Sequence, residues 1–463
     1  MDILFINPPW YKKSGNIWKS VSACLPPFGL ALLAAISREK GFSVSILDFN
    51  ALQVGLDKFE EHLPDSPPKF IGITATTLLI NNALEISKIV RKKYPNTKII
   101  FGGVHTTVMP REILAKKEVD YIVMREGENS LIELLSGKNP EEINGIGFKR
   151  DGKLIINEPQ PIIPDLNIFP FLAYDILPVN KYYSAAGSYK REPSFGMITS
   201  RGCPGRCTFC NGDLFGARIR FKTAEKMVEE IKLLQEKHGI KDIVFYDDTF
   251  TSNRNRVKEF CNLILENKMD LTWSCFSRVD TVDLETLKIM KEAGCHQVMY
   301  GIESGDAEIL KNIQKRISLE KVEETIAATK KAGIDTRLAF MIGNPGETEE
   351  TIQKTIKYAI FLDPDLAIFN ITTPYPGTQM FAWAESNNLL MHKNWEDYNF
   401  SMPVMKLPTI SSEKVLYYYK KAYQQFYMRP FYILKRLMKI RSFNDLKRNF
   451  RPFIGLINFS FNK

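Results

Sequence analysis

Three cysteines with short, regular spacing are the clearest chemical feature of this 463-residue sequence. Cys203, Cys207 and Cys210 follow the pattern C-x-x-x-C-x-x-C, and the glycines and prolines around them allow a tight loop. Three thiolates can bind three irons of a 4Fe-4S cluster and leave the fourth iron open to an added ligand. The alternative is an incomplete zinc site, but zinc usually takes a closed set of four ligands, and no histidine or further cysteine lies nearby in the sequence. The odd total of seven cysteines also favours metal ligation over disulfides.

The elements around these cysteines predict a partial barrel. Strand-like segments alternate with charged segments of helical length, and six such units are too few for a complete eightfold barrel. Cys261, Cys275 and Cys295 fall inside these elements, where small core residues are expected. The strand candidates are residues 195–200, 242–248, 271–275, 297–301, 335–342 and 366–371.

The cysteine motif, placed directly after the first strand of a six-unit partial barrel, resembles the radical S-adenosylmethionine (SAM) superfamily over residues 190–400. The resemblance implies that SAM binds the open iron through its amino and carboxylate groups. One electron from the cluster then cleaves SAM to a 5′-deoxyadenosyl radical, which abstracts hydrogen from an unactivated position. A flavodoxin or ferredoxin is the implied electron donor.

The resemblance also implies SAM contacts just beyond the strand ends. Phe209 matches the aromatic residue that contacts adenine, and Asp247 and Asp248 stand near the expected methionyl amino group. An arginine can pair bidentately with a carboxylate, and acids or hydroxyls can bond the ribose. Each of these residues also has a structural alternative, such as a helix cap or a surface ion pair. The other expected SAM contacts are Arg278, Glu303, Ser304 and Arg337.

The first 140 residues alternate short strands with amphipathic helices. This rhythm predicts an open, doubly wound, mostly parallel α/β sheet of the Rossmann-like type, with ligands at the carboxyl ends of its strands. The strand candidates are residues 3–7, 44–48, 70–74, 98–102 and 121–123, and the helix candidates are residues 29–40, 82–93 and 130–135.

Such a domain ahead of a radical SAM barrel resembles the cobalamin-binding branch of the superfamily, which includes the anaerobic magnesium-protoporphyrin monomethyl ester cyclase and carbon methyltransferases. The D-x-H-x-x-G loop that supplies a histidine to cobalt is absent, although many members of this branch bind cobalamin without a protein base. A domain that no longer holds cobalamin is the alternative. The expected cobalamin contacts are Asn7, Pro8, Gly29, Thr74, Thr76, Gly102, Gly103, His105 and Glu126.

With both cofactors, the resemblance implies methylation of an unactivated carbon in a small-molecule or lipid-like substrate. The runner-up is radical cyclisation, oxidation or rearrangement without net methyl transfer. No residue in the sequence separates these two reactions.

The remaining organisation is a proline-rich linker at 141–190, the barrel at 191–400 and an aromatic, basic, helical region at 401–463. Residues 413–463 hold 12 of the 62 Lys and Arg residues but only 2 of the 53 Asp and Glu residues, so the rest of the chain is nearly neutral. This region predicts either peripheral contact with an anionic membrane or simple packing. A third reading, an RNA-modifying protein that binds through the tail, is disfavoured because no RNA-binding module is evident.

Composition sets the remaining limits. A hydrophobic content of 44% and a charged content of 25% exclude a disordered chain. The N-terminus lacks a basic region and a cleavage site, and no apolar run approaches the roughly 20 residues of a membrane-spanning helix. The sequence therefore predicts a cytoplasmic protein, with membrane association through the C-terminal region as the open alternative.

Overall fold

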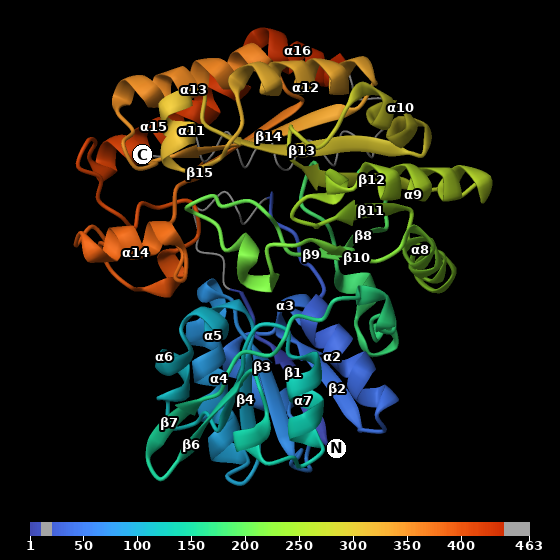
Figure 1. Cartoon of the computed structure of the whole chain (residues 1–463), viewed down its shortest axis with the longest axis vertical. Helices are drawn as coiled ribbons and strands as arrows, with labels where there is room; N and C mark the ends of the chain where they lie inside the picture. Colours follow the sequence, from blue (N-terminus) through green and yellow to red (C-terminus); the bar gives the residue numbers. More distant parts are fainter. Residues whose placement is uncertain (11–20, 439–463) are drawn as a thin grey trace.

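The structure, a computed structural model, describes residues 1–10 and 21–438. The last part of the predicted C-terminal region, residues 439–463, lies outside these described ranges. Two sheets occupy the two ends of the molecule, and the cysteine loop lies in the region between them (Figure 1).

The first sheet has seven strands in the order β2-β1-β3-β4-β5-β6-β7. The first five are parallel and have the bounds that the sequence predicts. A hairpin adds two antiparallel strands at the edge, within the range that the sequence analysis assigns to the linker. The strands are β1 (Ile3–Asn7), β2 (Val44–Asp48), β3 (Phe70–Thr74), β4 (Lys98–Gly102), β5 (Tyr121–Val123), β6 (Ile146–Arg150) and β7 (Lys153–Ile156).

Helices cover both faces of this sheet, as expected for a doubly wound fold. One apolar cluster joins α2 and α7 to residues such as Phe5 on one face, and a second joins α4 and α6 to residues such as Ile71 on the other. The helices are α2 (Phe28–Glu39), α3 (Phe49–Leu52), α4 (Ile80–Lys93), α5 (Val104–Val108), α6 (Pro110–Leu114) and α7 (Glu128–Leu135).

The second large sheet is a six-stranded, entirely parallel half-barrel in the order β15-β14-β13-β12-β11-β8. All six predicted strands are present, and the last two have the predicted bounds. Helices follow the strands on the outer side (Figure 1). The strands are β8 (Ser194–Met197), β11 (Asp242–Phe245), β12 (Thr272–Ser277), β13 (Cys295–Glu303), β14 (Asp335–Ile342) and β15 (Leu366–Ile371); the helices are α8 (Ala224–His238), α9 (Arg254–Glu266), α10 (Leu284–Glu292), α11 (Ala307–Asn312), α12 (Leu319–Lys331), α13 (Glu349–Leu362) and α14 (Gln379–Ser386).

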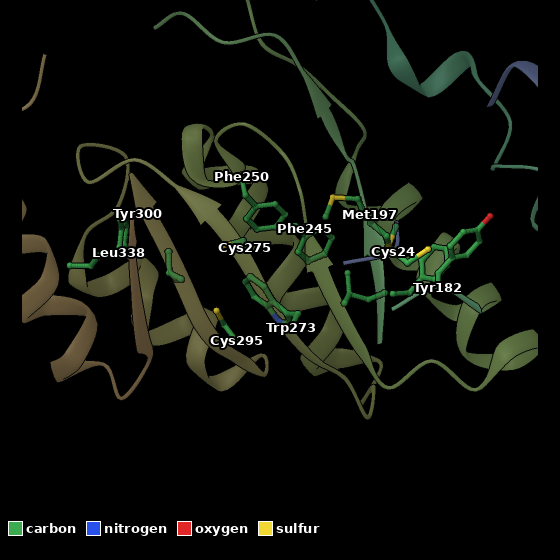
Figure 2. Close-up of a cluster of buried hydrophobic side chains, with 14 of the residues drawn as sticks. Cys24, Tyr182, Met197, Phe245, Phe250, Trp273, Cys275, Cys295, Tyr300 and Leu338 are labelled. Carbon is green, nitrogen blue, oxygen red and sulfur yellow. The ribbon is translucent and has the colours of Figure 1, made fainter. Parts of the chain in front are cut away.

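Large aromatic side chains and small cysteines fill the core of the half-barrel (Figure 2). Trp273 packs against Phe245 at 5.7 Å and Phe250 at 5.5 Å between ring centroids. Cys275 and Cys295 lie in the same buried cluster as free thiols, as does Cys261. The prediction that these three cysteines are core residues is confirmed.

The open edge of the half-barrel is closed by tyrosines from α15 (Ser412–Tyr427) and α16 (Pro430–Met438). The Tyr423 hydroxyl pairs with the backbone N–H and C=O of Phe369, and the Tyr427 hydroxyl pairs with those of Ala367. The Tyr432 hydroxyl donates to the carbonyl of Asp365. Side-chain hydroxyls therefore replace a missing strand at β15, which explains part of the aromatic composition of this region by packing.

Within residues 1–10 and 21–438, no helix is long and apolar enough to span a bilayer.

Candidate active site

The cysteine loop is held at both ends by a short antiparallel pair, β9 (Ser200–Arg201) and β10 (Arg220–Phe221). Gly202 has a φ of +92°, and a Cβ atom there would lie 2.5 Å from the carbonyl oxygen of Gly216. Only glycine fits this conformation without a clash. The loop thus leaves the β8 strand in one defined direction and turns at once into the first cysteine.

The three thiols surround a space that two glycines keep open. A Cβ atom on Gly205 would lie 3.3 Å from the Sγ of Cys203 and 3.9 Å from that of Cys207, and one on Gly212 would lie 3.8 Å from the Sγ of Cys210. Among the described residues, no three His, Cys, Asp or Glu side chains converge closely enough to hold a single metal ion. Three cysteines grouped around this space suit an iron–sulfur cluster, whose irons take thiolate ligands.

Two cations lie close to these thiols. Lys315 forms an ion pair with Glu303 at 2.8 Å, and the Nη1 atom of Arg278 would lie 3.9 Å from a Cβ atom on Gly205. Burial raises the pKa of the Cys207 thiol, while Lys315 and Arg278 act in the opposite direction. Positive charge near Cys207 favours the thiolate form of that residue and would also attract a carboxylate.

The backbone around the ion pair of Glu303 and Lys315 is unusual. Glu303 has a φ of +71°, and the residues on each side of Lys315, Gln314 and Arg316, both have a φ of +53°. Left-handed conformations of non-glycine residues cost energy and gather at functional sites. These backbone conformations bring Glu303, at the end of β13, and Lys315, in the loop after α11, into contact with each other.

The two adjacent aspartates have different surroundings. Asp247 is buried, and its carboxylate accepts hydrogen bonds from the backbone N–H groups of Thr199 and Ser200 at 2.5 and 3.0 Å. Asp248 lines the large cavity described below. Burial, and then Asp247, raise the pKa of Asp248. The structure thus places Asp247 as an anchor of the segment before the cysteines and only Asp248 facing the open space.

Two other expected SAM contacts also point to protein neighbours. The Ser304 hydroxyl is buried and lies 3.1 Å from that of Thr355 on α13. Phe209 packs beside an apolar cluster that includes Ile313 and Met380. Phe209 therefore joins the cysteine loop to the C-terminal elements of the barrel, and Ser304 is occupied in holding a helix.

One cavity of about 400 Å³ lies between the two sheets, where both sets of strands end. The first domain contributes apolar side chains and glycines, and the barrel side contributes Arg201, Gly202 and Asp248. A Cβ atom on Gly103 would lie 2.7 Å from the carbonyl oxygen of Ala75, so glycine is needed where these two loops meet. Of the residues expected to contact cobalamin, the cavity is lined by Gly29, Thr74, Thr76, Gly102, Gly103 and Glu126.

The other three expected cobalamin residues do not line this cavity. The side chain of Asn7 donates to Asp48 at 2.8 Å, and Pro8 follows it as a buried residue. The Nδ1 atom of His105 lies 3.1 Å from the Thr77 hydroxyl, and its ring packs edge-on against Trp395 at 5.2 Å between centroids. His105 is fully buried in these contacts, and none of the described residues that line the cavity is a histidine.

The Glu126 carboxylate is bound by two arginines from the cysteine side of the molecule. Arg201 donates to it at 3.0 Å, and Arg220 donates to both of its oxygens at 2.9 and 2.7 Å. A second bond of 2.6 Å joins Arg201 to Glu128. Burial raises the pKa of Glu126, but the arginines outweigh this effect and hold it below its usual value.

Sequence reasoning missed Lys315, Arg201 and Arg220. Lysine in a charged loop after a short helix has no distinctive signal, and its pairing with Glu303 arises only in the fold. Arg201 precedes Gly202-Cys203 directly, and its position beside the motif was the one signal available.

The comparisons with known proteins agree with this architecture. Residues 197–359 match the family model described as "Radical SAM superfamily", and residues 17–135 match the "B12 binding domain". The chain is 38% identical over 452 residues to "Uncharacterized methyltransferase PH0819" from Pyrococcus horikoshii, covering 96% of each protein. The chain therefore belongs to the cobalamin-binding branch of the radical SAM superfamily. It is an enzyme whose cofactors are a 4Fe-4S cluster, SAM and cobalamin.

More distant relatives extend the picture. The anaerobic magnesium-protoporphyrin IX monomethyl ester cyclase of Rubrivivax gelatinosus is 27% identical, covering 94% of this chain and 78% of that protein. The structure of the radical SAM methyltransferase TsrM from Kitasatospora setae matches with a TM-score of 0.73 at 18% identity, covering 99% of both chains. The structure of the cobalamin-dependent radical SAM enzyme OxsB matches with a TM-score of 0.76 at 17% identity, covering 98% of this chain and 72% of that one. These two structural matches support the fold.

Proposed function

We propose that this enzyme methylates an unactivated carbon of a small-molecule or lipid-like substrate. The observation that carries the proposal is a cavity that touches both the cysteine loop and the strand ends of the B12-binding domain. A substrate in this space could reach both cofactors. The relative with 38% identity carries the name methyltransferase, which also supports methyl transfer.

Each cofactor has a proposed set of residues. Cys203, Cys207 and Cys210 hold the cluster, which supplies the electron that cleaves SAM. Arg278 and Lys315 receive the SAM carboxylate, and Glu303 and Phe209 bound the rest of its site. In the B12-binding domain, Thr74 and Thr76 offer hydroxyls to the polar edge of cobalamin, and the glycines at 29, 102 and 103 allow its close approach.

Methyl transfer can be separated from cyclisation or oxidation by the fate of SAM. Reduced, fully loaded enzyme is incubated with methyl-labelled SAM and a small-molecule extract of the cells that produce it. The proposal predicts 5′-deoxyadenosine, S-adenosylhomocysteine and label in an extracted product. Formation of 5′-deoxyadenosine with neither S-adenosylhomocysteine nor labelled product would contradict methyl transfer and favour the radical reaction without it.

The electron donor is proposed to be a flavodoxin or ferredoxin. The Cys210 residue is exposed, so the cysteine loop is open to solvent on one side. Reduction of the cluster by a purified flavodoxin system, followed by its absorbance, tests this proposal. Absence of reduction by both flavodoxin and ferredoxin would contradict it.

Peripheral contact with an anionic membrane is proposed for the C-terminal region. The side chains of Phe431, Leu434 and Met438 on α16 are 71%, 54% and 67% exposed, and the surplus of positive charge lies in the same part of the chain. Flotation with vesicles containing anionic lipid, compared with neutral vesicles and with an RNA gel shift, tests the proposal. Flotation should fall strongly when Phe431 and Leu434 are changed to Ser, and unchanged flotation or RNA binding alone would contradict membrane contact.

A further inference from the structure

A second arginine of the barrel, Arg337, lies apart from the groups around the cysteines. It is the third residue of β14, whose alternate side chains Leu338 and Phe340 belong to the apolar core under the helices. Because successive side chains of a strand point to opposite faces, Arg337 points into the barrel. Arg337 was expected to contact SAM, but the groups that act on its pKa lie outside the cysteine loop.

Arg337 is a charged group without a counter-ion among the described residues. Its Nε atom is buried and has no hydrogen-bond partner, and no carboxylate of the described residues pairs with its guanidinium. Burial lowers the pKa of Arg337, and the ionisable groups nearest to it are the phenols of Tyr246, Tyr427 and Tyr423, which carry no charge at neutral pH. Arg337 is part-buried as a residue, and a cation that is partly removed from water without an acidic partner is costly and normally implies a ligand.

The strand register connects Arg337 to the cavity. Met299 pairs with Arg337 on one side and with Phe276 on the other, and the ring of Phe276 lies 5.4 Å from that of Tyr246. Tyr246 lines the cavity together with Asp248. One layer of the barrel therefore extends from the cavity wall to Arg337, just below the level of Asp248 and Arg278.

The opposite end of the barrel is closed. The carbonyl oxygen of Gly187 accepts a hydrogen bond from Gln297 at 2.9 Å, and that of Ser188 accepts one from Ser274 at 2.7 Å. A segment before β8 thus crosses the floor of the barrel and ties to β12 and β13. A ligand for Arg337 must then enter from the cavity, where the cofactors bind.

We propose that Arg337 receives an acidic group of the substrate, a carboxylate or a phosphate-type oxyanion, at the bottom of the barrel. This inference rests on the proposed function, because it places the substrate between the floor of the barrel and the two cofactors. The guanidinium can bind such an oxyanion through two parallel N–H bonds, which also fixes its orientation. The substrate is therefore an organic acid whose reacting carbon lies away from its acidic group.

Inorganic phosphate and acetate serve as probes of this site. Binding is measured by calorimetry on the fully loaded enzyme with saturating SAM, so that the SAM site is filled. We expect saturable binding of at least one of the two anions, weakened at least about tenfold in Arg337→Gln and less in Arg337→Lys, which keeps the charge. The stronger probe distinguishes a carboxylate from a phosphate. Absence of binding by both anions, or equal binding by Arg337→Gln, would overturn the proposal.

Stability gives an independent test with a matched control. Arg256 is the more deeply buried of the two arginines, and its side chain donates to the carbonyl of Lys222 at 2.9 Å and to Thr199. In the cofactor-loaded enzyme without substrate or added anion, Arg337→Met should raise the midpoint of thermal unfolding by about 2 °C or more, because it removes an unpaired charge, while Arg256→Met should lower it. A comparable loss of stability in both variants would show a structural role for Arg337 and overturn the proposal. Iron and cobalt contents are measured on the same preparations, so failure of the proposed function appears separately as missing cofactor.

Discussion

Arg201 and Glu126 form an ion pair of 3.0 Å that joins the cysteine loop to the B12-binding domain. Arg201 lies two residues before the first cysteine, and Glu126 lies in the loop after β5. Arg220 binds the same carboxylate from the other end of the cysteine loop at 2.7 Å. Both ends of the loop are thus tied to one buried carboxylate, which fixes the cysteine loop relative to the strand ends of the B12-binding domain.

Replacing Glu126 by Gln should be strongly destabilising, because it leaves two buried guanidinium groups without their shared counter-ion. We expect a loss of about 3–5 kcal/mol in the free energy of unfolding, measured by denaturant titration. The control is Arg38→Met, which breaks an exposed ion pair with Asp175 and should cost less than about 1 kcal/mol. Equal effects of the two variants would contradict the role given to Glu126.

The tyrosines that close the edge of β15 give a second prediction. In Tyr427→Phe, the backbone N–H and C=O of Ala367 lose their partner while remaining buried. Leaving such groups unsatisfied should cost about 1–3 kcal/mol of stability. Tyr417, which is 52% exposed on the same helix, is the control, and Tyr417→Phe should be nearly neutral. A neutral Tyr427→Phe variant would show that the hydroxyl does not replace a strand partner.

Glu347, in the loop after β14, should make the free energy of unfolding depend on pH. Burial raises the pKa of Glu347 from 4.5 to about 7, although its carboxylate accepts backbone hydrogen bonds from Gly343 at 2.5 Å and Asn344 at 2.9 Å. A raised pKa in the folded state stabilises the protein fully below the unfolded pKa, and this contribution is lost as the pH rises through about 7.

Glu347→Gln keeps an oxygen acceptor but cannot ionise. The stability of the wild type relative to Glu347→Gln should therefore fall as the pH rises from about 4.5 to about 7 and then level off. Unfolding midpoints measured across this range test the sign. If the difference in unfolding midpoint between the wild type and Glu347→Gln stayed constant, or if the wild type gained stability relative to the variant as the pH rose, the raised pKa of Glu347 would be contradicted.

Lys315 offers a test of the proposed SAM site. Lys315→Met removes a cation beside the cysteines, so we expect SAM binding to the loaded enzyme to weaken by about tenfold or more, measured by equilibrium dialysis. Lys311→Met is the control, because Lys311 is an exposed lysine at the end of the preceding helix. Unchanged SAM affinity in Lys315→Met would remove Lys315 from the site.

Much of the fold is predictable because its signals are local. The spacing of apolar residues and the glycine and proline breaks predict eleven of the strands, five in the first sheet and six in the half-barrel, and the cysteine motif is recognised from its own spacing. The hairpin of β6 and β7 was missed because short antiparallel edge strands have a weak pattern and lie in a proline-containing stretch.

The site was less predictable because burial and partners are decided by tertiary contacts. Asp247 and Asp248 are neighbours in the sequence, yet one is bound to backbone groups and the other faces the cavity. Glu126 was expected to contact cobalamin, but its carboxylate is occupied by arginines 75 and 94 positions away. Only the fold shows which side chains remain available to a ligand.

The central claim is that Cys203, Cys207 and Cys210 hold a cluster beside a cobalamin site. Its most direct test is anaerobic reconstitution of the full chain, followed by quantification of iron, sulfide and cobalt with absorption spectra. We expect about four irons and four sulfides per chain, with bound cobalamin, in the wild type and in the core variant Cys295→Ala. We expect loss of the cluster when Cys203, Cys207 and Cys210 are all changed to Ala. Normal iron and sulfide content in that triple variant would contradict it.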